Sequence, residues 1–309
     1  MSGGSAPPFF LVGCPRSGTT LLQAQLDAHP EVAVAPETFY ARRFLAKPKR
    51  YDPATDEGRE RLIDDLAATP EFAEMDLDRE RFAAAVRAAP RDRGAPFRIL
   101  LEQFGARRGV ARVGEKTPNH LLAMPALEAL FDGARFVHVV RDARAVALSW
   151  RSVPWTNGSL AADAAVWRKY QVAARTAPPR DGRLLTVRYE ELVRAPREVL
   201  ERVCRFLDLR FDEAMLRHQE AAAVDVEREP WKAGVREAVT ASRVDAWREE
   251  LSPGEIREIE AAVWPELSRA GYVPEHGAFR LLPGLARATL ARTAKRWRRA
   301  RKARGGERR

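Results

Sequence analysis

The chain has 309 residues, of which 45% are apolar and 31% charged, a composition that is ordinary for a folded globular protein and excludes a disordered one. No apolar run approaches the roughly 20 residues that a membrane-spanning helix needs. The net charge is +10, but residues 287–309 carry eleven Lys or Arg and one Glu, so the remainder is neutral; this favours a basic tail and argues against a nucleic-acid-binding surface.

The first half of the chain predicts two strands joined by a helix. The run PFFLVG (8–13) is short and apolar and predicts a buried strand. Residues 18–28 carry apolar side chains at helical spacing and stop before His29-Pro30. The segment EVAVAPE (31–37) predicts a second strand that ends at Glu37. Residues 41–109 predict several short helices, and we expect this helical segment to shape the acceptor side of the site.

The second half predicts strands and helices that alternate. Strands are expected in 111–118, 135–140 and 183–192, and helices in 124–131, 143–153, 160–175 and 196–209. Helices of this length between strands are the crossover connections of parallel strands. The sequence therefore predicts an α/β fold, a three-layer sandwich with a mostly parallel central sheet, in a single domain over 1–280.

The segment GCPRSGTT (13–20) follows the first predicted strand and opens the first predicted helix, as a phosphate-binding loop does. Backbone N–H groups and the helix N-terminus can hold an anion there, and Gly18 allows close approach. The ATPase pattern GxxxxGK[ST] is broken, because Thr19 stands where Lys is expected and the nearby cation is Arg16. The loop predicts a nucleotide-using group-transfer enzyme and disfavours an ATPase.

Four segments in chain order resemble one enzyme family. They are PRSGTT, VVRDARAVALSW, VRYEELVRAPREVLERVCRFLDL and SRVDAWREELSPGEIREIE. Together they are similar to motifs of the sulfotransferases that use 3′-phosphoadenosine 5′-phosphosulfate (PAPS), in particular the tyrosylprotein and bacterial members. The resemblance covers roughly residues 8–272 and implies a P-loop NTPase-like fold, a PAPS donor with 3′-phosphoadenosine 5′-phosphate as product, and no required metal.

The resemblance also implies roles for individual residues. Glu37 matches the catalytic base, and Arg16 and Lys116 match cations beside the transferred group. The donor-binding residues it implies are Arg16, Ser17, Gly18, Thr19 and Thr20 for the 5′-phosphosulfate, Arg141 and Ser149 for the 3′-phosphate, and Tyr189 near the adenine. The segment before Trp247 departs from the family, since it has no clear Lys, and Arg243 is the possible substitute.

Other readings of these residues stay open. Glu37 can be a surface carboxylate, and Lys116 a salt-bridge partner of Glu115 or Glu37. Arg141 and Asp142 can form a local salt bridge or a pair that binds Mg²⁺. His138 is expected to be a buried histidine with satisfied hydrogen bonds, and His29 a structural one.

The function predicted from the sequence is transfer of a sulfuryl group to a hydroxyl of an unidentified acceptor, which can be a small metabolite, a carbohydrate, a lipid or a peptide. A P-loop kinase using ATP–Mg²⁺ and an inactive nucleotide- or membrane-binding protein are the alternatives. No nucleic-acid partner is expected.

A cytoplasmic location is expected, because the two cysteines, Cys14 and Cys204, lie far apart and the N-terminus lacks the basic opening of a secretory signal. The tail, 281–309, has a basic amphipathic pattern. It is either solvated or in peripheral contact with an anionic membrane, which would be the inner membrane surface.

Overall fold

The structure is a computed structural model that describes residues 6–220 and 240–277. Contacts divide the chain into two compact units. The first comprises Met1–Val140 and Ala173–Ala241, and the second Arg141–Val172 and Ser242–Arg309. The predicted basic tail, 281–309, lies outside the described residues.

The first unit contains a sheet of five parallel strands. They are β1 (Phe9–Gly13), β2 (Val32–Ala35), β3 (Arg112–Lys116), β4 (Arg135–Val140) and β5 (Leu184–Arg188), in the order β2-β3-β1-β4-β5. All five residues of the central strand β1 are buried, which explains its uninterrupted apolar sequence. Leu11 pairs with Lys116, and Gly13 with Val139. The carboxyl ends of β1, β3 and β4 therefore lie along one edge of the sheet, and the predicted parallel sheet is confirmed.

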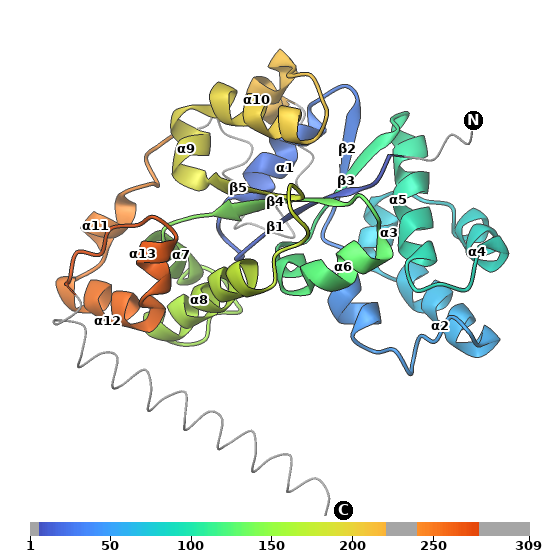
Figure 1. Ribbon diagram of the computed structural model, residues 1–309, viewed down its shortest axis with the longest axis horizontal. Coiled ribbons are helices and arrows are strands. Elements are labelled where there is room, and N and C mark those ends of the chain that lie inside the picture. Colours follow the sequence, from blue (N-terminus) through green and yellow to red (C-terminus); the bar gives the residue numbers. More distant parts are fainter. Residues whose placement is uncertain (1–5, 221–239, 278–309) are drawn as a thin grey trace, which may run out of the picture. The chain divides into compact units, whose positions relative to one another are not determined.

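Helices cover both faces of this sheet (Figure 1). On one face, the apolar side chains of β1 and β4 pack with those of α1 (Thr19–Asp27), α9 (Tyr189–Arg194), α10 (Pro196–Phe206) and η3 (Glu213–Glu220). On the other face, Phe10 and Phe136 stack at 5.3 Å and join Phe97, His120 and Phe131. These come from α5 (Ala95–Arg108), η2 (Pro118–Ala123) and the end of α6 (Met124–Leu130). The predicted three-layer sandwich is confirmed.

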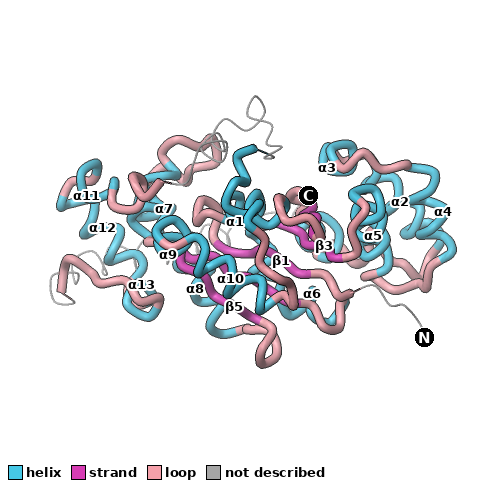
Figure 2. Tube along the Cα trace, turned by 90° about the horizontal axis from the view of Figure 1, so that it is seen from above, coloured by secondary structure: helices cyan, strands magenta, loops and turns pink. Residues whose placement is uncertain are grey.

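The segment 41–109 is helical, as predicted. It contains the π-helix η1 (Ala41–Leu45), α2 (Asp56–Ala67), α3 (Pro70–Glu74), α4 (Arg79–Ala88) and α5. The side chains of Thr55, Thr69 and Asp78 accept hydrogen bonds from the first turns of α2, α3 and α4, and so set where these helices begin. Figures 1 and 2 show α2–α5 gathered together, with α5 beside β2 and β3.

The second unit is helical. Its elements are α7 (Ala143–Trp150), most of α8 (Leu160–Thr176), α11 (Ala246–Glu250), α12 (Pro253–Val263) and α13 (Glu266–Arg269). Helix α7 packs against α11 and α12. Helix α12 starts at a capping box, in which Ser252 and Glu255 each bind the backbone of the other. Within 6–220 and 240–277, no helix is long and apolar enough to cross a membrane.

Several predicted boundaries differ from the structure by a few residues. The strand predicted over 183–192 ends at Arg188, and α9 begins at Tyr189, where Glu190 and Glu191 occupy a helix N-terminus that favours acidic residues. The helix predicted over 143–153 ends at Trp150. The second strand ends at Ala35, before Pro36, which has no N–H for the ladder. Glu37 thus follows the strand by two residues.

Candidate active site

The loop between β1 and α1 is a tight turn that needs its glycines. A Cβ at Gly13 would lie 2.5 Å from the backbone oxygen of Val139, so the chain passes too close to β4 for any side chain. The N–H of Ser17 donates to the carbonyl of Cys14 at 3.1 Å. Arg16 and Gly18 have φ of 73° and 99°, values that side chains disfavour. The loop is held in a strained shape, as loops at functional sites often are.

Several donors in this loop are suited to an anion. The N–H of Leu22 makes its intrahelical bond to Gly18 at 3.2 Å, and no side chain caps α1. The amides of Thr19, Thr20 and Leu21 therefore precede the first intrahelical bond. Ser17 is fully buried, and its Oγ finds no hydrogen-bond partner among the described residues. A buried hydroxyl normally has a partner, so this loop fits a bound phosphate-like group.

Tyr189 lies directly against this loop. A Cβ at Gly18 would come within 2.4 Å of Tyr189 Cδ2. Tyr189 is the first residue of α9, which follows β5 directly, and it is half-buried. The structure thus brings the predicted adenine-side residue and the predicted phosphate loop together at the carboxyl end of the sheet.

Glu37 and Lys116 form an ion pair at the same edge of the sheet. Lys116 Nζ lies 2.5 Å from Glu37 Oε1, with 1% of the lysine side chain and 21% of the glutamate side chain exposed. Lys116 is the last residue of β3, next to β1. Of the two ion-pair partners open to Lys116 in the sequence, Glu37 is the one observed. A carboxylate and an ammonium in contact, partly accessible to solvent, can accept a proton and stabilise negative charge.

Arg141 and Ser149 lie on the second unit. Arg141 follows β4 in the chain and precedes Asp142, the N-cap residue of α7, while Ser149 is half-buried near the end of α7. Arg141 Nη2 donates to the carbonyl of Arg243 at 2.8 Å, and Trp167 Nε1 donates to the carbonyl of Arg141 at 2.9 Å. The backbone of Arg243 therefore supports Arg141, and the substitution of the Arg243 side chain for the family's lysine stays a prediction.

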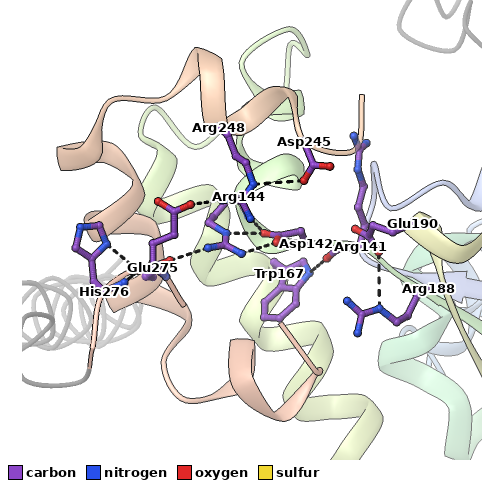
Figure 3. Close-up of polar contacts among 11 residues, drawn as sticks. Arg141, Asp142, Arg144, Trp167, Arg188, Glu190, Asp245, Arg248, Glu275 and His276 are labelled. Atoms are coloured by element: carbon purple, nitrogen blue, oxygen red, sulfur yellow. Dashed lines mark hydrogen bonds and ion pairs between the residues drawn. The ribbon is translucent and has the colours of Figure 1, made fainter. Parts of the chain in front are cut away.

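A buried ion cluster fixes the start of α7 (Figure 3). Arg144, 2% exposed, pairs with Asp142 at 2.7 Å and with Glu260 of α12 at 2.8 Å, and its guanidinium lies 3.8 Å from the centre of the Trp247 ring. Burial by itself would lower the pKa of Arg144, but hydrogen bonds and the charges of Asp142 and Glu260 outweigh it and raise the pKa. Glu260 also binds the side chain and N–H of His276. Because its ring packs against the guanidinium of Arg144 in this cluster, Trp247 has a structural role.

The structure confirms the prediction for His29 but only part of the prediction for His138. His29 is structural, as predicted, since its ring accepts from Glu31 N and binds the carbonyl of Arg210 at 2.7 Å. His138 is buried, as predicted, but its Nε2 has no partner among the described residues, so the expectation of satisfied hydrogen bonds fails at this nitrogen. Cys14 and Cys204 are both buried, and neither forms a disulfide within the part of the chain that the structure describes. Residues 6–220 and 240–277 contain no cluster of three His, Cys, Asp or Glu that could hold a metal ion.

Sequence reasoning missed a polar cluster around Glu115, which contains Thr38, Thr117 and His120. Thr38 and Glu115 lie 77 positions apart in sequence, and a single sequence gives no sign that 38–41 meets 115–120. The one available signal was the alternation in β3: Glu115 and Thr117 point to one face of the sheet and Lys116 to the other. A buried strand that carries Glu and Thr on one face implies a polar cluster there.

Comparisons with known proteins agree with this geometry. Residues 7–213 match the model of the sulfotransferase family. A putative protein-tyrosine sulfotransferase of Caenorhabditis briggsae is 29% identical over 85% of this chain and 88% of the relative. Protein-tyrosine sulfotransferase 1 of Danio rerio is 28% identical over 87% of this chain and 73% of the relative.

Among solved structures, the sulfotransferase domain of the Synechococcus PCC 7002 olefin synthase has the same fold, with a TM-score of 0.60 and 24% identity. The match covers 88% of this chain and 97% of that domain. The family match spans the phosphate loop, both members of the Glu37–Lys116 pair, and Arg141, Ser149 and Tyr189. This chain belongs to the sulfotransferase family.

Proposed function

We propose that this protein transfers a sulfuryl group from PAPS to the hydroxyl of a tyrosine in a peptide or protein. The observation that carries the proposal is the Glu37–Lys116 ion pair, which lies at the carboxyl end of β3 next to the strand that leads into the phosphate loop. Two relatives that align with most of this chain are named protein-tyrosine sulfotransferases, and this favours tyrosine over the carbohydrate, lipid and metabolite hydroxyls that the sequence left open.

The pair supplies what the reaction needs from the protein. The donor provides the sulfuryl group and leaves as 3′-phosphoadenosine 5′-phosphate. As the oxygen of the acceptor hydroxyl bonds to sulfur, Glu37 accepts the proton of that hydroxyl. Such general-base catalysis typically contributes about 10²- to 10⁴-fold in rate. Lys116 and Arg16 stabilise the negative charge that develops on the transferred group and on the leaving phosphate.

The donor-binding residues we propose are those that the family resemblance implies. The backbone of Ser17, Gly18, Thr19 and Thr20 with the Ser17 hydroxyl would hold the 5′-phosphosulfate, and Tyr189 would lie near the adenine. Arg141 and Ser149 would hold the 3′-phosphate. The loop has Thr19 in place of the lysine that ATP-binding loops use, which counts against the kinase alternative.

Calorimetric binding of 3′-phosphoadenosine 5′-phosphate, with ADP and ATP–Mg²⁺ as comparators, tests the donor. We expect the 3′-phosphorylated nucleotide to bind most tightly and Arg141→Ala to weaken that binding by about 2 to 3 kcal/mol, because a charge-assisted phosphate contact is lost. Arg151→Ala is the matched control, since Arg151 is an exposed arginine at the other end of α7 that pairs with Glu255. Preference for ATP–Mg²⁺ would overturn the proposed donor.

The acceptor is tested with an acidic-to-neutral series of tyrosine peptides and their phenylalanine counterparts, using PAPS labelled in the sulfuryl group. Label is expected in tyrosine peptides alone. Glu37→Gln keeps the shape of the side chain but cannot take the proton, so its kcat should fall by at least about 10²-fold with nucleotide binding retained. Transfer to sugars or lipids, with none to tyrosine, would contradict the proposed acceptor.

A further inference from the structure

A buried carboxylate, Glu115, lies behind the Glu37–Lys116 pair. Glu115 is 0% exposed. Its Oε1 accepts hydrogen bonds from Thr38 N at 3.1 Å, from Thr38 Oγ1 at 2.8 Å and from Thr117 Oγ1, and its Oε2 lies 2.9 Å from His120 Nδ1. A buried carboxylate is tolerated only with such partners. Glu115 therefore joins the end of β3 to the chain after β2 through neutral donors.

The same cluster binds four successive backbone amides. Thr38 N donates to Glu115, Phe39 N to Thr117 Oγ1 at 3.2 Å, Tyr40 N to Thr38 Oγ1 at 3.3 Å, and Ala41 N to His120 Nε2 at 3.3 Å. Phe39 has φ of 51°, a conformation that a bulky residue adopts only when its surroundings impose it. The turn 38–41 is thus held in shape by side chains of residues 115–120 and by Thr38 itself.

The hydrogen-bond pattern also assigns the state of His120. Because Nε2 accepts the Ala41 N–H, the ring proton lies on Nδ1, where it is donated to Glu115 Oε2. His120 is therefore neutral and fixed in one tautomer. The ring can bridge Glu115 and the turn only in this form, since a proton on Nε2 would face the N–H of Ala41.

This cluster and the candidate catalytic pair share the same two segments of chain. Glu37 immediately precedes Thr38, and Lys116 lies between Glu115 and Thr117. Side chains alternate along a strand, so Lys116 reaches Glu37 while its two neighbours hold the turn that follows Glu37. Fixing one set of contacts fixes the other.

We propose that Glu115, with Thr38, Thr117 and His120, positions Glu37 against Lys116 for proton transfer from the acceptor; the inference rests on the function proposed above. These four are positioning residues, because they act through Glu37 and Lys116 and do not touch the reacting atoms. A misplacement of about 1 Å at a reacting group can cost on the order of 10²-fold in rate. Loosening the turn lowers kcat and leaves the KM for the donor nearly unchanged, since the phosphate loop is a separate segment.

The test compares Thr38→Val with Thr38→Ser in the full chain. Valine has the shape of threonine but removes the hydroxyl that donates to Glu115 and accepts from Tyr40 N, whereas serine keeps it. We expect kcat to fall about 10- to 100-fold in Thr38→Val and to recover in Thr38→Ser, with the donor KM within about twofold in both. Thr117→Val and Thr117→Ser form a second pair in case Thr38→Val does not fold.

Amide hydrogen exchange of residues 37–41, measured without donor or acceptor, is the readout that does not depend on activity. Exchange should rise in the valine variants and return to the wild-type rate in the serine variants, while exchange in β1 and β4 stays unchanged. An active wild type whose valine variants keep full kcat would overturn the positioning inference alone. Absence of sulfuryl transfer by the wild type would overturn the proposed function, and unchanged exchange at 37–41 in the valine variants would overturn the positioning contacts independently of activity.

Discussion

Position 18 imposes two requirements, on backbone conformation and on side-chain size, that only glycine satisfies together. Its φ of 99° is one that L side chains rarely adopt, and a Cβ would approach Tyr189 Cδ2 to 2.4 Å. The first constraint belongs to the loop backbone and the second to the contact with α9. They can be separated by experiment because the tyrosine side chain can be removed without changing the loop sequence.

Gly18→Ala is expected to lower the free energy of unfolding by about 1 to 3 kcal/mol, from the backbone cost and the clash with Tyr189. Urea denaturation of Gly18→Ala, Tyr189→Ala and the double variant forms a double-mutant cycle. The alanine at 18 should cost less when Tyr189 is absent. Strictly additive effects would mean that the clash with Tyr189 contributes nothing.

The residues that the sequence identified are those whose local context carries the signal. The loop at 13–20 lies between an apolar run and a helix, and the structure places Ser17, Gly18 and Tyr189 together. Glu37 follows the end of β2 and Lys116 ends β3, and their side chains form an ion pair. The sequence did not identify Glu115 and His120, because their contacts are with residues 77 and 79 positions away in the chain. Only the assembled sheet brings these residues together.

Among the helices, α7 and α12 are tied by two ion pairs in very different surroundings. Arg144 and Glu260 are 2% and 0% exposed, whereas Arg151 and Glu255 are 42% and 36% exposed. Buried charges that lose their partner are strongly destabilising, while exposed pairs contribute little. The two pairs join the same helices, so they form an internal comparison.

Arg144→Met should lower the free energy of unfolding by about 3 to 5 kcal/mol, because Asp142 and Glu260 would remain buried without their cation. Arg151→Met should cost under about 1 kcal/mol. Both are measured by urea denaturation at pH 7. Adding Glu260→Gln to Arg144→Met should recover part of the loss. Equal costs for the two arginine variants would show that the buried cluster does not hold these helices.

Helices and strands were predicted well where the apolar pattern is clear, as in the buried strands β1 and β4 and in the long helix α8. The sequence-based prediction failed at RLLTVRYEEL, where apolar and polar residues alternate from Thr186 to Glu190, across the point at which α9 begins at Tyr189. Propensity alone does not mark this boundary. Leu192 and Val193 are buried in α9, and Leu192 packs in the layer of α1 and α10, so packing against the sheet face decides where β5 ends.

For the stability of the whole protein, His138 is one of the groups that link folding to pH. It lies in the middle of β4, is 3% exposed, and burial lowers its pKa from 6.5 to about 4. The unfolded chain therefore binds a proton more readily than the folded protein does. The contribution of a neutral His138 is fully present above about pH 6.5, is lost as the pH falls toward 4, and changes no further below that.

A shift of this size corresponds to a loss of about 3 kcal/mol in the free energy of unfolding between pH 7.5 and pH 4. His138→Leu removes the titrating group and leaves all others in place. The difference in unfolding free energy between wild type and His138→Leu, measured by urea denaturation at intervals across this range, cancels the contributions of the other ionisable groups. That difference should move steadily against the wild type as the pH falls. A difference that stays constant with pH would mean that the folded protein admits a charged imidazole at this position, and that water or a rearranged neighbour satisfies the Nε2 atom left without a partner in β4.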